Sequence, residues 1–418
     1  MIAARRRPAV IRGASNETPW ATWRSDLRAE VLTASPHTSL PLSAQLGTSA
    51  TFGYVAQEGA DHLLEYANSM WDLPTTLGGA VRRAMERQPH EPYLYASAPL
   101  RNLASLQERA VGWERLTVAE AEVGGLASLW LSGANVTTQC HYDVDHNVHV
   151  QLAGSKRWVL FPPQAASELS LFGFLHPRYR TSQVPFHSEP RTRPPSEWKL
   201  SPQEQLDFPR ARHALERALT VELHAGDALY LPPFWPHHVT ALAEPGEIVI
   251  SLNVFSTSRA WEQLNAMDAV PLPFDEAWLA PRGASAEGRA EQHGGGRRAV
   301  LTAATRTWIE LCLTSKGHSV AAFAGDLLRG GYPESERASS TLECGESAGD
   351  GWYGPPRRAA FTKRASELGA IASEIERVEG AAVARLAMMR HVEMVLFNFI
   401  GLRDAGAFLE RCLPPRDG

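Results

Sequence analysis

The sequence predicts a mainly β fold in the first two thirds of the chain and an α-helical region in the last third. Residues 138–163 and 247–253 are rich in Val, Ile, Leu, Phe and Trp and are bounded by Gly or Pro, as buried strands are. Residues 299–328 and 383–399 instead repeat apolar side chains every three or four positions, which is the periodicity of a packed helix. Residues 59–88 carry the same helical pattern, so we expect helical elements ahead of the strands as well.

Composition indicates where the domain boundary lies. Residues 281–300 are dominated by Gly, Ala, Ser, Glu and Arg, which is the composition of a flexible linker. We expect one domain over residues 1–270, a linker over 271–300, and a helical region over 301–418 that contains a disordered stretch at about 333–358.

The overall composition, with 44% hydrophobic and 21% charged residues, is that of a soluble globular protein. The formal net charge of −5 gives the whole chain no attraction for nucleic acid. No run approaches the roughly 20 apolar residues that span a bilayer, and the basic N-terminus lacks the apolar segment of a secretory signal. We expect no membrane partner.

The four cysteines form no CxxC pair and no zinc-binding spacing, which favours a reducing compartment, cytoplasmic or nuclear. They are Cys140, Cys312, Cys344 and Cys412.

The stretch TQCHYDVDHNVHVQLAGSKRWVLFPP, residues 138–163, contains the strongest functional signal. His141 and Asp143 are separated by one residue, so in a strand both side chains point to the same face. Residues 153–155 supply a turn, and we expect the flanking strands to form a β-hairpin. The motif alone is weak, because many strands carry a single His-x-Asp by chance.

A second stretch, GDALYLPPFWPHH, offers a third ligand. It places a Gly226–Asp227 turn, a short apolar strand and a Pro-Pro break ahead of His237. Two His and one carboxylate, with the remaining positions open, form the facial triad typical of non-haem Fe(II) oxygenases. By itself, a His after a buried Trp is more often a core or surface residue than a ligand, so the interpretation depends on the two stretches together.

Lys156 follows the turn and begins an apolar run. A Lys that enters a barrel here can pair, as a point charge, with a carboxylate held away from the metal. The alternative is a solvent-exposed Lys, as we expect for the neighbouring Arg157.

Together these motifs resemble the JmjC/cupin-like Fe(II)- and 2-oxoglutarate-dependent oxygenase family. The resemblance rests on HYD, Asn147, GSKRWVLFPP, GDALYLPPFWPHH and SLNVF, and it covers residues 1 to about 260. Within the family, the chain is most similar to the hypoxia-inducible-factor asparaginyl hydroxylase and the tRNA wybutosine hydroxylase. The resemblance implies a double-stranded β-helix core, the jelly-roll or cupin fold, built from two antiparallel sheets.

The resemblance also implies the chemistry. The iron ligands would be His141, Asp143 and His237. The co-substrate 2-oxoglutarate would be decarboxylated to succinate while dioxygen is used to hydroxylate a C–H bond. The far carboxylate of 2-oxoglutarate would be held by Lys156, Thr138 and Tyr93. Tyr95 competes with Tyr93 because both lie on one strand face, and Thr137 competes with Thr138 because a one-residue shift would exchange them.

Several further polar residues surround this site in the sequence. Asn147 and Asn253 match family residues that line the co-substrate pocket; the alternative is a pair of buried amides that bond to backbone. His149 departs from the family, which usually has an apolar or aromatic residue there, and we expect a satisfied core His, with a substrate contact or a base as the alternatives. We expect His146 and His238 to lie outside the ligand set.

The sequence leaves the substrate open. The acidic net charge favours a protein or peptide side chain. A modified tRNA base is the alternative, and a non-catalytic cupin-like metal-binding protein is a third possibility. The C-terminal helices offer a surface through which the chain could form a homodimer.

Overall fold

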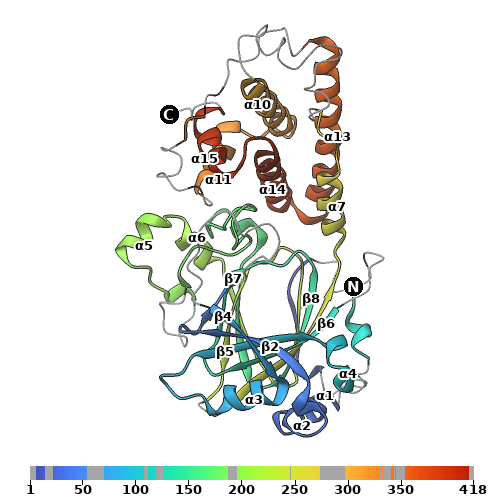
Figure 1. Cartoon of the computed structure of the whole chain (residues 1–418), viewed down its shortest axis with the longest axis vertical. Helices are drawn as coiled ribbons and strands as arrows, with labels where there is room; N and C mark the ends of the chain where they lie inside the picture. The colour runs from blue at the N-terminus through green and yellow to red at the C-terminus, as the bar shows by residue number, and fades with distance from the viewer. Residues whose placement is uncertain are drawn as a thin grey trace. The chain divides into compact units, whose positions relative to one another are not determined.

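The computed structural model describes most of the chain, and the residues outside the description are 1–5, 15–21, 54–69, 108–111, 119, 121–125, 187–194, 245, 274–296, 330–331, 333–339, 343, 345–353 and 414–418. The described residues form two compact units (Figure 1). The barrel unit lies within residues 1–55, 65–171 and 180–262. The helical unit contains residues 172–179 and the described residues after 262.

The larger sheet of the barrel unit has eight antiparallel strands. Along β6 the side chains alternate: Leu129 and Leu131 join the hydrophobic core on one face, whereas Trp130 and Ser132 point to the other. In spatial order the strands are β1 (Ala9–Ile11), β11 (Ala228–Leu231), β8 (His146–Ala153), β13 (Ile248–Ser256), β6 (Leu126–Gly133), β5 (Tyr93–Pro99), β2 (Pro41–Gly47) and β4 (Met70–Thr76).

The smaller sheet has five strands, which in spatial order are β10 (Leu219–His224), β9 (Ser155–Leu160), β12 (His237–Leu242), β7 (Thr137–His141) and β3 (Thr51–Phe52). All pairs are antiparallel except β3 with β7. From β6 to β13 the chain passes repeatedly between the two sheets. This is the connectivity of a jelly roll, and it confirms the predicted double-stranded β-helix.

Short helices cover the apolar face of the larger sheet. Trp23 and Leu32 are fully buried in that core, as are Leu77 and Val81 of α3. Residues 59–88 were expected to be helical, but only the second part is: residues 70–76 form strand β4, and 59–69 lie outside the described residues. The helices of the barrel unit are α1 (Trp23–Asp26), α2 (Ala29–Thr33), α3 (Leu77–Glu86), α4 (Ala104–Gln107), α5 (Pro202–Asp207) and α6 (Ala211–Glu216).

The predicted hairpin at residues 153–155 is wrong. Gly154, with φ +64°, makes the turn, but β8 pairs with β11 and β13 whereas β9 pairs with β10 and β12. The turn therefore carries the chain from one sheet to the other. Asp143 also differs from its predicted place, because β7 ends at His141 and Asp143 lies in the loop beyond it.

The helical unit is built mainly from α10 (Arg297–Ser315), α11 (Val320–Arg329), α13 (Pro355–Glu379), α14 (Ala381–Phe399) and α15 (Leu402–Arg411); α7 (Arg259–Asp268) leads into it from the barrel unit. The apolar side of α14 is covered within the unit, since Val383, Val395 and Leu396 are fully buried. Of the predicted linker, residues 274–296 lie outside the description, and 297–300 are helical. Most of the stretch at 333–358 also lies outside it, and α13 begins at Pro355.

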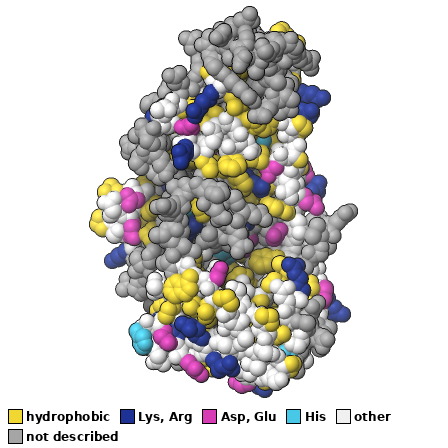
Figure 2. Space-filling view, in the orientation of Figure 1, with side chains coloured by type: hydrophobic (Ala, Val, Ile, Leu, Met, Phe, Trp, Pro, Cys, Tyr) yellow, Lys and Arg dark blue, Asp and Glu magenta, His cyan; other side chains and the backbone are white. Residues whose placement is uncertain are grey.

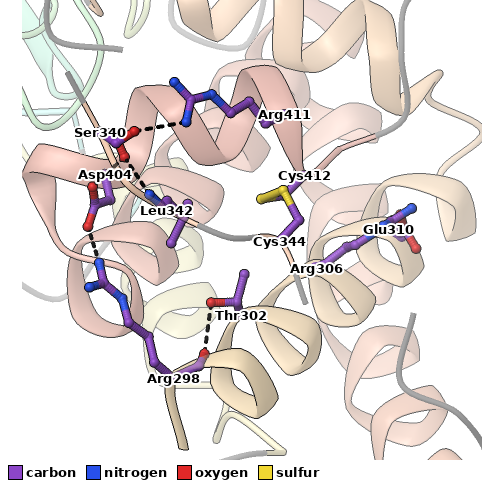
Figure 3. Close-up of a disulfide and its surroundings, with 10 residues drawn as sticks. All are labelled: Arg298, Thr302, Arg306, Glu310, Ser340, Leu342, Cys344, Asp404, Arg411 and Cys412. Atoms are coloured by element: carbon purple, nitrogen blue, oxygen red, sulfur yellow. Dashed lines mark hydrogen bonds and ion pairs between the residues drawn. A yellow bond between two sulfur atoms is a disulfide. The ribbon is translucent and has the colours of Figure 1, made fainter. Parts of the chain in front are cut away.

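A disulfide links Cys344 to Cys412 in the helical unit (Figure 3). Nearby, Arg298 pairs with Asp404, which also accepts a hydrogen bond from Ser340. The spacing of the cysteines did not predict this pair. The expectation of a reducing compartment rested on the lack of pairing, so the disulfide removes that basis, and a cytoplasmic or nuclear location stays a prediction. In the described residues, no helix has the length and apolarity needed to cross a membrane.

Glu393 on α14 is a buried carboxyl in the helical unit. It accepts hydrogen bonds from the Tyr332 hydroxyl (2.9 Å) and from the backbone N–H of Phe174 (2.7 Å). Burial raises its pKa to about 7. The folded chain therefore keeps a proton on Glu393 over a pH range in which the unfolded chain has lost it, and stability falls as the pH rises toward 7.

We expect Glu393→Gln, which has the same shape and no proton to lose, to raise the free energy of unfolding above pH 7 by roughly 1–3 kcal/mol. The gain should shrink toward pH 5. Thermal and urea unfolding at pH 5 and pH 8 measure it, with the exposed Glu410→Gln as control. Equal pH dependence in wild type and Glu393→Gln would contradict this assignment.

Candidate metal centre

Three side chains that could hold a metal ion meet where β7 and β12 lie side by side. His141 ends β7 and is the register partner of His237, the first residue of β12. Asp143 follows in the loop after β7. One ligand atom from each of the three residues can be chosen so that all lie within 4.8 Å of one another, and Asp143 Oδ2 is 3.7 Å from His237 Nε2. His237 is buried, whereas the side chain of Asp143 is 25% exposed.

Backbone carbonyls orient both imidazoles. His141 Nδ1 lies 2.7 Å from the carbonyl of Gln139, and His237 Nδ1 lies 2.9 Å from that of Trp235. A proton on each Nδ1 satisfies these contacts and leaves both Nε2 lone pairs for a metal. Burial, and secondarily the neighbouring His141, lowers the pKa of His237 to about 4, so its imidazole is neutral, as a ligand must be. Two neutral imidazoles and one carboxylate fit a divalent transition metal such as Fe(II).

The loop before β12 is docked onto the loop that carries Asp143. Phe234 donates its backbone N–H to the carbonyl of Asp143 (2.8 Å), and its ring lies 5.6 Å from that of Tyr142. Phe234 has φ +61°, an unfavourable value for a residue with a side chain. This contact ties the two halves of the candidate site together across 90 residues of sequence.

Lys156 points into the barrel. The residue is 6% exposed, and Nζ donates to the hydroxyl of Ser251 at 2.9 Å. Burial lowers the pKa of Lys156 to about 7. Within the described part of the chain, no carboxylate forms an ion pair with it. Lys156 is therefore not a solvent-exposed residue, which was the alternative. The expectation that Arg157 is solvent-exposed is wrong, because its side chain is only 15% exposed and pairs with Glu222.

The structure distinguishes the competing tyrosines and threonines. Thr138 and Tyr95 meet through their hydroxyl groups at 3.3 Å. Burial raises the pKa of the Tyr95 phenol. The guanidinium of Arg87 instead lies over the ring of Tyr93, with Cζ 3.6 Å from the ring centroid. Thr137 donates to Thr240. The hydroxyl pair that the structure brings together is therefore Thr138 with Tyr95, and it includes neither Thr137 nor the Tyr93 chosen from the sequence.

Comparison with known proteins agrees with this architecture. The sequence profile of a family described as "Cupin-like domain" matches residues 1–259, more than half of the chain. The chain belongs to the cupin-like domain family. This confirms the predicted resemblance to JmjC/cupin-like proteins.

Three relatives illustrate the family. The chain is 29% identical over 163 residues to Lysine-specific demethylase JMJ31 of Arabidopsis thaliana, 31% over 148 residues to tRNA wybutosine-synthesizing protein 4 of Neurospora crassa, and 26% over 216 residues to HSPB1-associated protein 1 of Homo sapiens. These matches cover 39%, 35% and 49% of the chain. They span only 25%, 10% and 40% of the respective relatives.

The cupin-like domain has a polar network on the inner face of its larger sheet. His149 lies opposite Asn253 in the pairing of β8 with β13, and the amide of Asn253 donates to Asn147 at 3.1 Å. Gln151 lies beside His149. All four are buried. Gln151 and Ser251 were not predicted from the sequence, although both continue the alternation that places Asn147, His149 and Asn253 inside.

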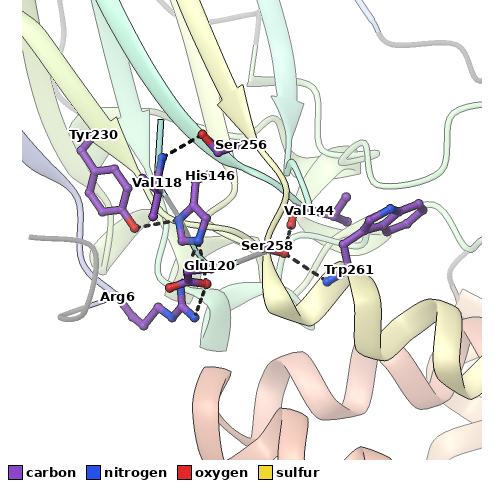
Figure 4. Close-up of polar contacts among 9 residues, drawn as sticks. All are labelled: Arg6, Val118, Glu120, Val144, His146, Tyr230, Ser256, Ser258 and Trp261. Carbon is purple, nitrogen blue, oxygen red and sulfur yellow. Dashed lines mark hydrogen bonds and ion pairs between the residues drawn. The ribbon is translucent and has the colours of Figure 1, made fainter. Parts of the chain in front are cut away.

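The two other histidines of the motifs lie outside the ligand set, as expected. His146 contacts Tyr230 (2.9 Å), Glu120 (2.9 Å) and Arg6 (3.2 Å), as Figure 4 shows. His238 packs edge-on against Phe186, with ring centroids 6.0 Å apart. Both residues are buried in the cupin-like domain, outside the group of three candidate ligands.

Proposed function

We propose that the cupin-like domain is an Fe(II)- and 2-oxoglutarate-dependent dioxygenase that hydroxylates a side chain of a protein or peptide. One observation carries the proposal: a face of two His and one carboxylate shares a barrel with Lys156, a buried amine that has no carboxylate partner among the described residues. A charge is costly to bury unpaired. An anionic co-substrate is the simplest partner for it.

In this proposal, His141, Asp143 and His237 hold Fe(II). When bound, Fe(II) together with 2-oxoglutarate supplies the activation of dioxygen, with release of succinate and carbon dioxide. The protein contributes binding and orientation. Lys156 pairs with the far carboxylate of 2-oxoglutarate, to which Thr138 and a tyrosine donate hydrogen bonds.

The assignment of that tyrosine moves from Tyr93 to Tyr95, because only Tyr95 contacts Thr138. Asn147 and Asn253 provide amides beside the same pocket. The low exposure of Lys156 and both Asn residues keeps water away from these contacts and strengthens them.

A protein or peptide is the proposed substrate for two reasons. The chain is acidic overall. On the face seen in Figure 2, the Lys and Arg side chains that the structure describes are interspersed with Asp and Glu and form no continuous basic surface. The relative named as a lysine-specific demethylase also favours a protein substrate, whereas the wybutosine-synthesizing relative supports the tRNA alternative.

The experiment that tests the proposal is succinate release from 2-oxoglutarate, with Fe(II) in air, by wild type and Asp143→Ala. The proposal predicts slow succinate release by wild type without added substrate, and no release by Asp143→Ala. Release by wild type should become faster when peptides, with and without N-methylated lysine, are added and one of them is a substrate. Stimulation by tRNA and not by peptides would favour the alternative substrate. Tight metal binding with no succinate release under any condition would support the non-catalytic alternative.

The affinity for 2-oxoglutarate should depend on pH through Lys156. Burial holds its pKa at about 7 in the free protein, and a bound carboxylate favours the charged form. The dissociation constant should therefore be flat below pH 7 and rise about tenfold per pH unit above it. Calorimetric titration of the Mn(II)-loaded protein between pH 6 and 9 measures this, and Lys156→Arg should remove the slope because Arg stays charged. A flat profile in wild type would contradict the assignment.

We also propose that the chain can dimerise through its helical unit. Most apolar side chains of α14 are buried, but Phe397, near the end of the helix, is 46% exposed and offers an apolar contact to a second chain. Light scattering of wild type and Phe397→Glu tests the proposal, which a monomeric wild type would contradict.

A further inference from the structure

His149 connects the two sheets of the barrel beside the candidate site. It lies on β8 of the larger sheet, is fully buried, and reaches β9 of the smaller sheet. We propose that His149 is a positioning residue: it fixes the amides of Asn253 and Asn147 for 2-oxoglutarate while its ring packs against Trp158 behind the ligand His237. This inference rests on the proposed function.

The polar contacts of His149 set the orientation of the neighbouring amides. Gln151 donates its amide N–H groups to the carbonyls of Ala153 (2.7 Å) and Ile250 (3.3 Å), and its Oε1 lies 3.2 Å from His149 Nε2. His149 Nδ1 lies closer to its own partner, 2.7 Å from Asn253 Oδ1. Because an amide oxygen only accepts, the neutral ring of His149 carries its proton on Nδ1 and donates it to Asn253.

From Asn253 the network continues to Asn147, 3.1 Å away. A side-chain amide whose oxygen is held by one hydrogen bond cannot rotate freely, so the direction of its N–H groups is fixed as well. Loss of the His149 contact would free Asn253 to rotate, and Asn147 with it. The network thus holds both candidate co-substrate contacts in one arrangement.

The ring of His149 makes a second, aromatic contact. It meets Trp158 edge-on, with centroids 4.8 Å apart, and Trp158 lies 5.4 Å from the ring of His237 at an interplanar angle of 30°. A substitution that keeps an aromatic ring should preserve this packing, whereas one that keeps only the polar group should preserve the amide network. The two contacts can therefore be separated by mutation.

The test is calorimetric binding of 2-oxoglutarate to the Mn(II)-loaded full chain. We expect His149→Phe to weaken 2-oxoglutarate binding about tenfold, because it leaves a buried amide unpaired, and to leave Mn(II) affinity within about twofold. Asn253→Leu should weaken 2-oxoglutarate at least as much, and the double variant no further than Asn253→Leu alone. His90→Phe, at an exposed His, is the matched control.

A purely structural role would lower the thermal stability of His149→Phe but would not produce this non-additivity. His149→Gln retains an amide that can reach Asn253 and should bind 2-oxoglutarate within about threefold of wild type, which gives a second test if the Phe variant does not fold. Unchanged binding by His149→Phe, effects that multiply in the double variant, or tenfold weaker binding by His149→Gln would each overturn the inference. Failure of wild type to bind 2-oxoglutarate would overturn the proposed function itself.

Discussion

Asp143→Ala is expected to weaken divalent metal binding at least about 100-fold. Loss of an outer contact to a metal ligand already costs about 10- to 100-fold, and Asp143 is the only anionic member of the candidate triad. Its carboxylate lies 3.7 Å from His237 Nε2, and no other carboxylate joins this group within the described residues. Without Asp143, two neutral imidazoles would have to hold the ion.

Mn(II) binding, measured by the loss of the free-ion paramagnetic resonance signal, tests this prediction in the absence of turnover. Asp72→Ala, at an exposed residue of β4, is a matched control and should bind like wild type. Retention of wild-type affinity in Asp143→Ala would mean that the three residues do not form the metal site.

Lys156→Met is expected to weaken 2-oxoglutarate binding strongly and to stabilise the free protein. The lost charge pair corresponds to about 2–5 kcal/mol of binding free energy, or about 30-fold to several thousand-fold in affinity. Stability should rise because burial disfavours the charged amine, and Met fills a similar volume without a charge. Gain of stability with loss of binding is the expected behaviour of a residue retained for function.

Thermal unfolding of the metal-free protein and calorimetric titration of the Mn(II) form provide the two measurements for Lys156→Met. Mn(II) affinity should not change. Lys199→Met, at an exposed position, should alter neither quantity. If Lys156→Met bound 2-oxoglutarate as wild type does, the carboxylate would have to be held elsewhere.

The fold class and the metal-ligand candidates could be predicted because their signals are local and mutually consistent. His141 and Asp143 are one residue apart, and the Gly226–Asp227 turn ahead of His237 has a distinctive composition. The inner position of Lys156 followed from the same strand pattern. The structure brings these residues to one barrel, even though Asp143 lies in a loop and not on the strand.

The errors arose where the outcome depends on distant partners. The turn at Gly154 has the same local sequence whether the chain forms a hairpin or changes sheet. The choice depends on which strands β8 and β9 pair with, and their partner residues lie up to 110 positions away in the sequence. The choice between Tyr93 and Tyr95 depended on the position of Thr138 across the barrel. The Cys344–Cys412 disulfide joins residues 68 positions apart, which spacing alone cannot predict.

The most direct test of the central claim is anaerobic addition of 2-oxoglutarate to the Fe(II)-loaded chain, followed by visible absorption spectroscopy. Chelation of Fe(II) by a 2-oxo acid produces a visible charge-transfer band. We predict that this band appears in wild type, saturates at one 2-oxoglutarate per chain, and is absent in Asp143→Ala. Wild type that binds Fe(II) but develops no band at saturating 2-oxoglutarate would contradict the account.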